Sequence, residues 1–235
     1  MGKKYTRKEI LKKCEEAFKN ISTFYNSEPV EYKYTGRTLD TKEPYSEVVA
    51  EFLCERIEEF LDGITKINRE SSYSVKGHDG TYNPDSNRLE EIIAMQIFNQ
   101  CKNGSSLDFI GKVIDYQTPL KNARANSAGK IDLLSINDRT VYILELKKED
   151  STETMLRCVL EGYTYLKTVN SEKLLKDFGL PSDCEIKACP LVFRGGTQWK
   201  EMQEERLALK QLMRMLNSKP FYLSEKDGKY IVTEE

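Results

Sequence analysis

The sequence contains one histidine, His78, among its 235 residues. A histidine-based catalytic triad would therefore have to use His78, and a zinc site built from several histidines is excluded. Glycine-rich nucleotide-binding loops of the G-x-x-x-x-G-K-[ST] and G-x-G-x-x-G types are absent from the sequence. The six cysteines include no C-x-x-C pair, which argues against zinc ribbons and the usual iron–sulfur spacings.

Long apolar runs are also missing. No run approaches the roughly 18 residues of a membrane span, and no apolar segment follows the basic start as in a secretory signal. We therefore expect a cytoplasmic protein with reduced thiols and no membrane partner. The residues Met1-Gly2-Lys3-Lys4-Tyr5-Thr6 loosely match a myristoylation signal, which keeps membrane recruitment as a weaker alternative.

The charge balance is near neutral, with 36 Lys and Arg against 38 Asp and Glu. A net charge of −2 argues against a strongly basic nucleic-acid coat protein and is compatible with a local basic groove. Hydrophobic residues make up 39% of the chain, enough for a folded core. The length fits one large domain, or a core with a smaller attachment.

Two amphipathic helices are expected before residue 80, at about 6–25 and 45–61. The polar segments 26–44 and 64–86 are typical of loops. His78 lies in the second loop, where we expect it to be solvated, with a substrate contact as the alternative. We predict that residues 1–80 form an N-terminal helical cap or extension and that residues 81–235 form the core, ending in a helix and a hairpin.

The core segment alternates between helical and strand patterns. Helices are expected at about 86–101, 152–169 and 198–216. Strands are expected at about 111–117, 130–136, 141–147 and 185–193. Asn137-Asp138-Arg139 predicts a hairpin turn between two of these strands. The order helix, three strands, helix, strand indicates an α/β fold.

The residues that carry chemistry lie on this hairpin. Strand alternation puts Glu145 and Lys147 on the same face as the apolar residues that precede them. A charged pair that continues a buried face is unusual, because burying charge is costly without a partner or a metal. Asp132 lies on the adjoining strand and can bring a second carboxylate to the same place.

Two neighbouring carboxylates repel each other and raise each other's pKa, and a divalent cation removes that conflict. Mg²⁺ prefers such oxygen ligands and keeps water for substrate phosphates. We therefore predict that Asp132 and Glu145 bind Mg²⁺ or Mn²⁺. Lys147 would orient the attacking water or stabilise charge in the transition state. This combination suits phosphodiester hydrolysis.

Asp132 followed by Glu145-Leu146-Lys147 resembles the D…(D/E)-x-K signature of the PD-(D/E)XK nuclease superfamily. The resemblance implies a restriction-endonuclease-like αβββαβ core, with a mixed sheet flanked by helices and here an N-terminal helical extension. It implies metal ligation by Asp132 and Glu145, with the Leu146 backbone carbonyl as a further ligand. It also implies that Lys147 is the catalytic lysine.

Many members of this superfamily carry a further acid on the first core helix. Glu90 matches that position, with Glu91 as the alternative and a stabilised helix N-terminus as the purely structural reading of both. RecB-like members carry Q-x-x-x-Y on the helix after the lysine. Glu161 and Tyr165 lie at a suitable distance here, with Glu replacing Gln.

Several residues near the motif, most of them basic or aromatic, are candidates for substrate binding, through phosphate contacts and base stacking. They are Lys148, Arg157, Glu161, Tyr165, Lys130 and Arg124. The superfamily mostly cuts DNA, so we expect DNA as substrate, although the sequence itself does not distinguish DNA from RNA. The alternative function is a non-catalytic module that binds nucleic acid or protein on the same fold. A homodimer through the terminal hairpin or an edge strand is also left open.

Overall fold

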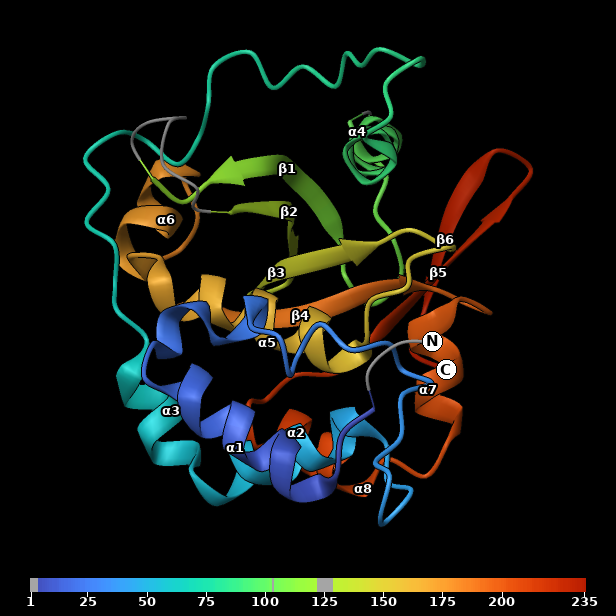
Figure 1. The fold of residues 1–235 in the computed structure, drawn as a ribbon. Helices are drawn as coiled ribbons and strands as arrows, with labels where there is room; N and C mark the ends of the chain where they lie inside the picture. The colour runs from blue at the N-terminus through green and yellow to red at the C-terminus, as the bar shows by residue number, and fades with distance from the viewer. Residues whose placement is uncertain (1–3, 103, 122–128) are drawn as a thin grey trace.

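A computed structural model describes residues 4–102, 104–121 and 129–235 of the chain. Within these residues, six strands form one mixed sheet whose spatial order follows the chain (Figure 1). The strands are β1 (Lys112–Pro119), β2 (Lys130–Asn137), β3 (Thr140–Lys147), β4 (Glu185–Phe193), β5 (Phe221–Lys226) and β6 (Lys229–Thr233). The pairs β1–β2, β2–β3 and β5–β6 are antiparallel, whereas β3–β4 and β4–β5 are parallel.

The β2–β3 hairpin forms where the sequence predicts it. Asn137 pairs with Thr140, which leaves Asp138 and Arg139 in the turn. Asp138 has a φ of 52°, a left-handed conformation that a short polar side chain tolerates better than most. The tight turn fixes the register of the two strands and therefore determines which residues lie opposite each other at their far ends.

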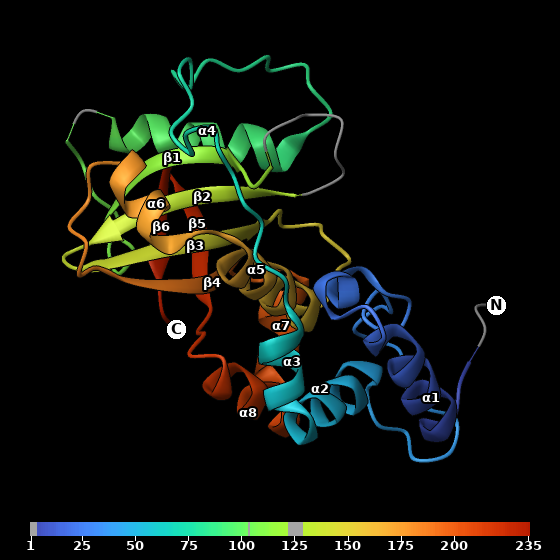
Figure 2. The same ribbon diagram turned by 90° about the vertical axis from the view of Figure 1, so that its left-hand side faces the viewer.

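Helices cover both faces of the sheet. They are α1 (Arg7–Phe18), α2 (Tyr45–Glu55), α3 (Ile57–Gly63), α4 (Leu89–Cys101), α5 (Met155–Thr168), α6 (Ser171–Asp177), α7 (Thr197–Gln203) and α8 (Leu207–Met215), with a 3-10 helix, η1 (Ile21–Asn26). Helix α4 lies on one face and α5 on the other, with α1, α2, α3 and α8 beyond α5 (Figures 1 and 2). The observed architecture is thus an α/β protein with an N-terminal helical region, as predicted at that level.

Both faces of the central strand β3 are buried. Leu144 packs in a hydrophobic cluster with Ala94 and Ile97 of α4, whereas Ile143 packs in a cluster with Ala188 and Val169 on the opposite side. A slip of one residue would exchange these faces, so the apolar pattern reinforces the register that the turn sets.

The first two predicted helices are each interrupted. The helix expected over 6–25 ends at Phe18 and continues as η1, and the helix expected over 45–61 breaks at Arg56 between α2 and α3. The Arg56 guanidinium lies 4.3 Å from the Phe18 ring centroid and donates to Glu15 at 2.6 Å. This contact ties the break to α1, and a single-helix pattern does not reveal such a long-range partner.

The helix expected over 198–216 is also divided, into α7 and α8. Arg206, between them, is fully buried and donates to Ser46 at 3.4 Å and to the Tyr34 carbonyl at 3.3 Å. The chain leaves helical geometry here because this side chain reaches α2 and the loop before it. Helix α6 was not predicted, since its seven residues are too few for a periodic signal.

The N-terminal helices share their core with the rest of the chain. Phe18, Phe52 and Phe60 belong to the same hydrophobic cluster as Leu156 of α5 and Leu212 of α8. The domain boundary near residue 80 stays a prediction, and Gly2 of the myristoylation pattern lies outside the described residues. Among the described helices, none has the length and apolar character needed to cross a bilayer.

Candidate active site

Asp132 lies near the start of β2 and opposite the end of β3, because Leu133 pairs with Leu144. Its Oδ2 accepts a hydrogen bond from the Leu146 backbone N–H at 2.9 Å, and its Oδ1 accepts one from Gln117 Nε2 at 3.0 Å. Gln117 has a φ of 48°, which is uncommon for a residue other than glycine. The carboxylate is therefore held from both neighbouring strands.

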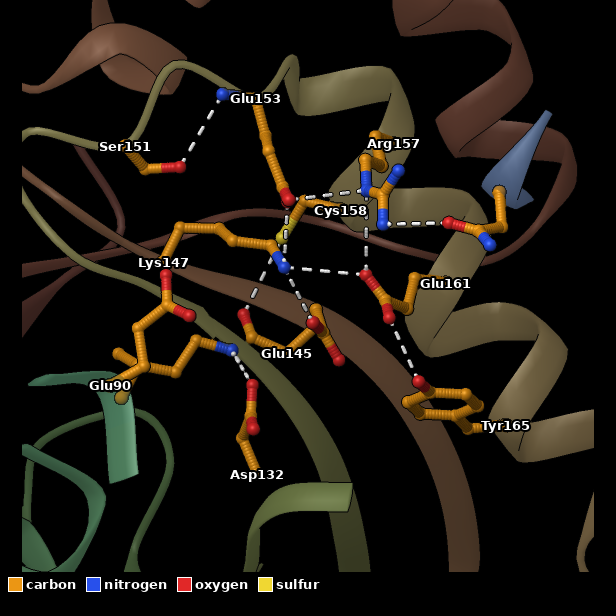
Figure 3. A network of polar contacts seen from close by, with 12 residues as sticks. Glu90, Asp132, Glu145, Lys147, Ser151, Glu153, Arg157, Cys158, Glu161 and Tyr165 are labelled. Atoms are coloured by element: carbon orange, nitrogen blue, oxygen red, sulfur yellow. Dashed lines mark hydrogen bonds and ion pairs between the residues drawn. The ribbon is translucent and has the colours of Figure 1, made fainter. Parts of the chain in front are cut away.

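Glu145 and Lys147 form a buried ion pair at the end of β3. Their exposed fractions are 4% and 5%, and Lys147 Nζ donates to Glu145 Oε1 at 2.8 Å. Nζ also lies 2.8 Å from Glu153 Oε2 and 3.3 Å from Glu161 Oε2 (Figure 3). One ammonium group thus faces three carboxyl groups, two of them largely buried, where uncompensated charge would be costly.

The protonation equilibria of this cluster are linked. Burial raises the pKa of Glu145 well above its ordinary value, although the charge of Lys147 opposes the rise. Burial alone would lower the pKa of Lys147, but Glu145 and Glu161 together raise it. Burial would also raise the pKa of Glu161, yet Lys147 lowers it. Lys147 is therefore charged, with Glu161 as an ionised partner.

Arg157 on α5 connects this cluster to the N-terminal region. Its Nε lies 3.3 Å from Glu153 Oε1 and 3.9 Å from Glu161 Oε2, two residues that also face Lys147. Its terminal nitrogens contact Glu31 Oε1 at 3.2 Å and Asn26 Oδ1 at 3.1 Å. The segment that follows α1 is thus joined to the motif through a single guanidinium.

Glu161 and Tyr165, the residues that match the Q-x-x-x-Y spacing, contact each other directly. The Tyr165 hydroxyl donates to Glu161 Oε1 at 2.8 Å, one helical turn away on α5. Burial raises the pKa of Tyr165, so the phenol keeps its proton and remains a donor. Tyr165 therefore helps to fix the carboxylate that faces Lys147.

A cavity of about 340 Å³ opens beside Asp132. It is lined by Asn87, Arg88, Leu89, Glu90, Glu91, Gln117, Asp132 and Lys148. Of the three motif residues, Asp132 lines this cavity, whereas Glu145 and Lys147 are buried. Asp132 thus connects the open cavity to the buried ion pair. Burial raises the pKa of Asp132, and the charge of Lys147 opposes part of that rise.

The two acids predicted on the first core helix both line the cavity and have different partners. Glu90 Oε1 accepts a hydrogen bond from the Lys148 backbone N–H at 3.1 Å, which brings α4 to the end of β3. Glu91 Oε1 lies 3.0 Å from Arg88 and 4.0 Å from Lys130. Glu90 is therefore the acid that contacts the chain directly after the motif, and its role near a metal stays a prediction.

The acidic groups are arranged around an ammonium rather than around a preassembled cation site. In the part of the chain that the structure describes, no three His, Cys, Asp or Glu side chains gather closely enough to hold a metal ion. Comparison with family models, curated proteins and solved structures found no match.

The residues predicted to bind substrate fall into separate places. Lys148 lines the cavity beside Asp132, with its ammonium 3.0 Å from Asp150 Oδ1. Lys130 is exposed near Glu91. Arg157, Glu161 and Tyr165 belong to the network around Lys147 and do not line that cavity. Arg124 lies outside the described residues. Substrate contact by these residues stays a prediction.

Two residues of the site were not predicted. Gln117 fixes Asp132, and Glu153 is a third carboxylate in ion-pair contact with Lys147. A signal for Glu153 exists in the sequence, since it lies four residues before Arg157, the spacing of a helical ion pair. The position of Gln117 depends on its left-handed backbone, which no feature of the local sequence requires.

His78 is less solvated than we expected. Its Nδ1 lies 2.7 Å from Asp115 Oδ1, and its ring stacks on Tyr116 with centroids 4.6 Å apart. Asp115 Oδ2 also accepts a hydrogen bond from Thr118 Oγ1 at 2.6 Å. The long loop before α4 is thus anchored on β1 by its histidine, a contact that depends on residues 37 positions away.

Asp132 gives the metal-free protein a specific dependence on pH. Burial raises its pKa from 3.8 to about 7. Between these values the folded state retains a proton that the unfolded state has released, so folding stability falls as pH rises through this window. One such group contributes at most about 1.4 kcal/mol per pH unit. In thermal unfolding with EDTA from pH 4 to 8, the melting temperature should therefore fall more steeply with pH for the wild type than for Asp132→Asn. Equal slopes would contradict the raised pKa.

Proposed function

We propose that this chain is a metal-dependent nuclease of the PD-(D/E)XK type that hydrolyses phosphodiester bonds, with DNA as its substrate. One observation carries the proposal: Asp132 lines an open cavity and adjoins the buried Glu145–Lys147 pair across the β2–β3 hairpin. The elements run α4, β1, β2, β3, α5, β4, apart from the additional α6. This order supports the restriction-endonuclease-like core that the motif implies.

The donor set is compatible with Mg²⁺ or Mn²⁺. Asp132 and Glu145 are carboxylates whose pKa values are raised mainly by burial, and a bound cation would favour their ionised forms. Mg²⁺ is commonly held by one or two carboxylates and keeps several waters, so three gathered acids are not required. The Leu146 carbonyl and Glu90 would be the further ligands.

The residues of the chain would divide the reaction as follows. A bound divalent cation would polarise the phosphoryl group and make water a better nucleophile. Lys147 would donate a hydrogen bond to the attacking water or to the developing negative charge. Its three carboxylate partners keep the ammonium charged and oriented, and release from one of them would free an N–H for this role. Lys148 and Arg88, at the cavity, would contact substrate phosphates.

The burial of Glu145 and Lys147 favours one second candidate, a non-catalytic module that binds nucleic acid. A structural ion pair at a strand end would satisfy the same contacts without any chemistry. Such a module would retain DNA with a steep salt dependence and would not cut it when metal is added.

The deciding experiment is a cleavage assay on single-stranded, duplex and branched DNA and on RNA, with Mg²⁺, Mn²⁺ or EDTA. We expect cutting that requires the metal and falls about a hundredfold or more in Glu145→Gln, because a metal ligand contributes several kcal/mol of charge stabilisation. Glu149→Gln, altered outside the motif, is the matched control and should cut like the wild type. Cutting that survives Glu145→Gln would overturn the residue assignment. Retention of DNA without cutting would support the binding module.

A further inference from the structure

A second cavity, of about 350 Å³, lies between η1, residues 65–67 and α5. Its wall carries hydroxyl and phenol groups from Ser22, Tyr25, Thr65, Thr164 and Thr168. Its volume lies in the range of small-ligand sites. This cavity shares no lining residue with the one beside Asp132, so it needs a separate explanation.

Thr164 supplies the observation that points to a ligand. Its side chain is 3% exposed, and its Oγ1 has no hydrogen-bond partner among the described residues. Buried hydroxyl groups are normally hydrogen-bonded, because an unsatisfied one loses its interaction with water and gains nothing in return. Thr164 lines the cavity, and threonine in a helix has two favoured χ1 rotamers, so its hydroxyl can turn from its buried position to the polar edge of a bound molecule.

The second cavity is connected to the motif through Tyr165. Tyr165 also lines this cavity, and its hydroxyl donates to Glu161 Oε1 at 2.8 Å. The other oxygen of Glu161 lies 3.3 Å from Lys147 Nζ. A ligand in the cavity would therefore contact a residue that helps to position the partner of the catalytic lysine.

The chemistry of the lining selects the class of ligand. Among the described lining residues there is no Asp or Glu, which disfavours a metal cation, and Lys121 supplies one positive charge. The Tyr25 and Tyr165 rings meet at 5.9 Å and 77°, so an aromatic edge and face border the polar groups. Aromatic rings suit a nucleobase, hydroxyls suit its polar edge and sugar, and a lysine suits the adjoining phosphate.

We propose that this cavity binds one nucleoside unit of a single DNA strand, close to the bond that is cut. The inference rests on the proposed function and adds a specific subsite to it. A nucleoside there would explain why the hydroxyl of Thr164 is kept in a buried position. It would also link occupation of the cavity to the position of Glu161 through Tyr165.

The test is equilibrium binding of a fluorescent single-stranded DNA 12-mer in EDTA, where metal-dependent cutting does not occur. Thr164→Val keeps the shape and removes the hydroxyl, so we expect binding to weaken about 3- to 10-fold, the effect of one neutral hydrogen bond. Ser135→Ala is the matched control, because Ser135 is also buried with an unpartnered hydroxyl but does not line this cavity. It should bind like the wild type.

Two further measurements make the test specific. An abasic substitution in the DNA at the bound position should abolish the difference between Thr164→Val and the wild type, since no base edge remains for the hydroxyl. Lys121→Gln should reduce the slope of log K against log salt by about 0.7, the value for one single-strand phosphate contact.

The outcomes separate this inference from the proposed function. If the wild type cuts DNA but Thr164→Val binds as tightly as Ser135→Ala, the subsite is wrong and the nuclease assignment stands. An unchanged salt slope in Lys121→Gln, or a Thr164→Val defect that persists at every abasic position, would also overturn the subsite. If the wild type neither binds nor cuts any nucleic acid, both proposals fail.

Discussion

Replacing Lys147 with methionine is expected to destabilise the fold by about 3–5 kcal/mol, because the change leaves buried carboxylates without their cation. Glu145 would lose its counter-ion at 2.8 Å, and Glu153 and Glu161 would keep Arg157 alone. Methionine has a similar length and is apolar, so a loss of packing cannot account for an effect of this size. Denaturant unfolding followed by circular dichroism measures it.

The pH dependence of this loss follows from the same charges. Without Lys147, the pKa values of the neighbouring carboxyl groups rise in the folded state. At low pH these carboxyl groups are protonated and neutral, so burying them without a cation costs little free energy. The destabilisation caused by Lys147→Met should therefore be smaller near pH 5 and should grow toward pH 8. The double variant Lys147→Met/Glu145→Gln should recover part of the loss, since it removes one uncompensated charge.

Lys12→Met is the matched control for Lys147→Met. The Lys12 side chain is 77% exposed and lies 3.9 Å from Glu16, so its removal should change stability by less than about 0.5 kcal/mol. An equal effect for both substitutions, or a loss at Lys147 that does not depend on pH, would contradict a compensated buried cluster. Cleavage by Lys147→Met, measured where it remains folded, should fall about 100- to 1,000-fold if the proposed function holds.

Arg206→Met should destabilise the protein by a comparable amount, about 3–5 kcal/mol, for a different reason. Arg206 is fully buried and lies 2.9 Å from Glu204, and its positive charge also lowers the pKa of buried Glu201, against a larger increase from burial. Its other contacts reach Ser46 and the Tyr34 carbonyl, so one side chain joins the α7–α8 connection to the N-terminal region. Removing it takes one donor from Ser46 and from the Tyr34 carbonyl and removes the positive charge that favours ionised Glu201.

The comparison for Arg206→Met is Arg194→Met. Arg194 is exposed and donates to the Glu235 carbonyl at 2.8 Å, so we expect little change in the free energy of unfolding. A loss below about 1 kcal/mol for Arg206→Met would show that α7 and α8 are held in place by apolar packing alone. A large loss with an unchanged dependence on denaturant concentration would support a local effect on the native state.

The strands and the hairpin could be predicted because their signals are local. A continuous apolar run defines β3, and Asp138-Arg139 marks its turn. Once the hairpin is fixed, the proximity of Asp132 to Glu145 follows from counting residues along two strands. That is why the central part of the candidate site agrees with expectation, whereas its chemistry remains a proposal.

The features that could not be predicted depend on distant contacts. The breaks at Arg56 and Arg206 arise where arginines bind residues of other helices, and helical periodicity contains no trace of those partners. The pairing of His78 with Asp115 is of the same kind. Gln117 required a backbone conformation that its own residue type disfavours. Sequence patterns describe faces and turns, but they do not identify these polar partners.

The distribution of the six free thiols makes the chain a reporter of its own unfolding. Cys14 and Cys158 belong to the hydrophobic cluster shared with the N-terminal helices, and Cys101 and Cys189 belong to the cluster under α4. Cys184 belongs to the cluster that contains Ile143. Burial raises the pKa of Cys14 to about 12, which keeps the unreactive thiol form in the native state. Pulsed alkylation followed by peptide mass spectrometry would therefore time the opening of each layer without an introduced label.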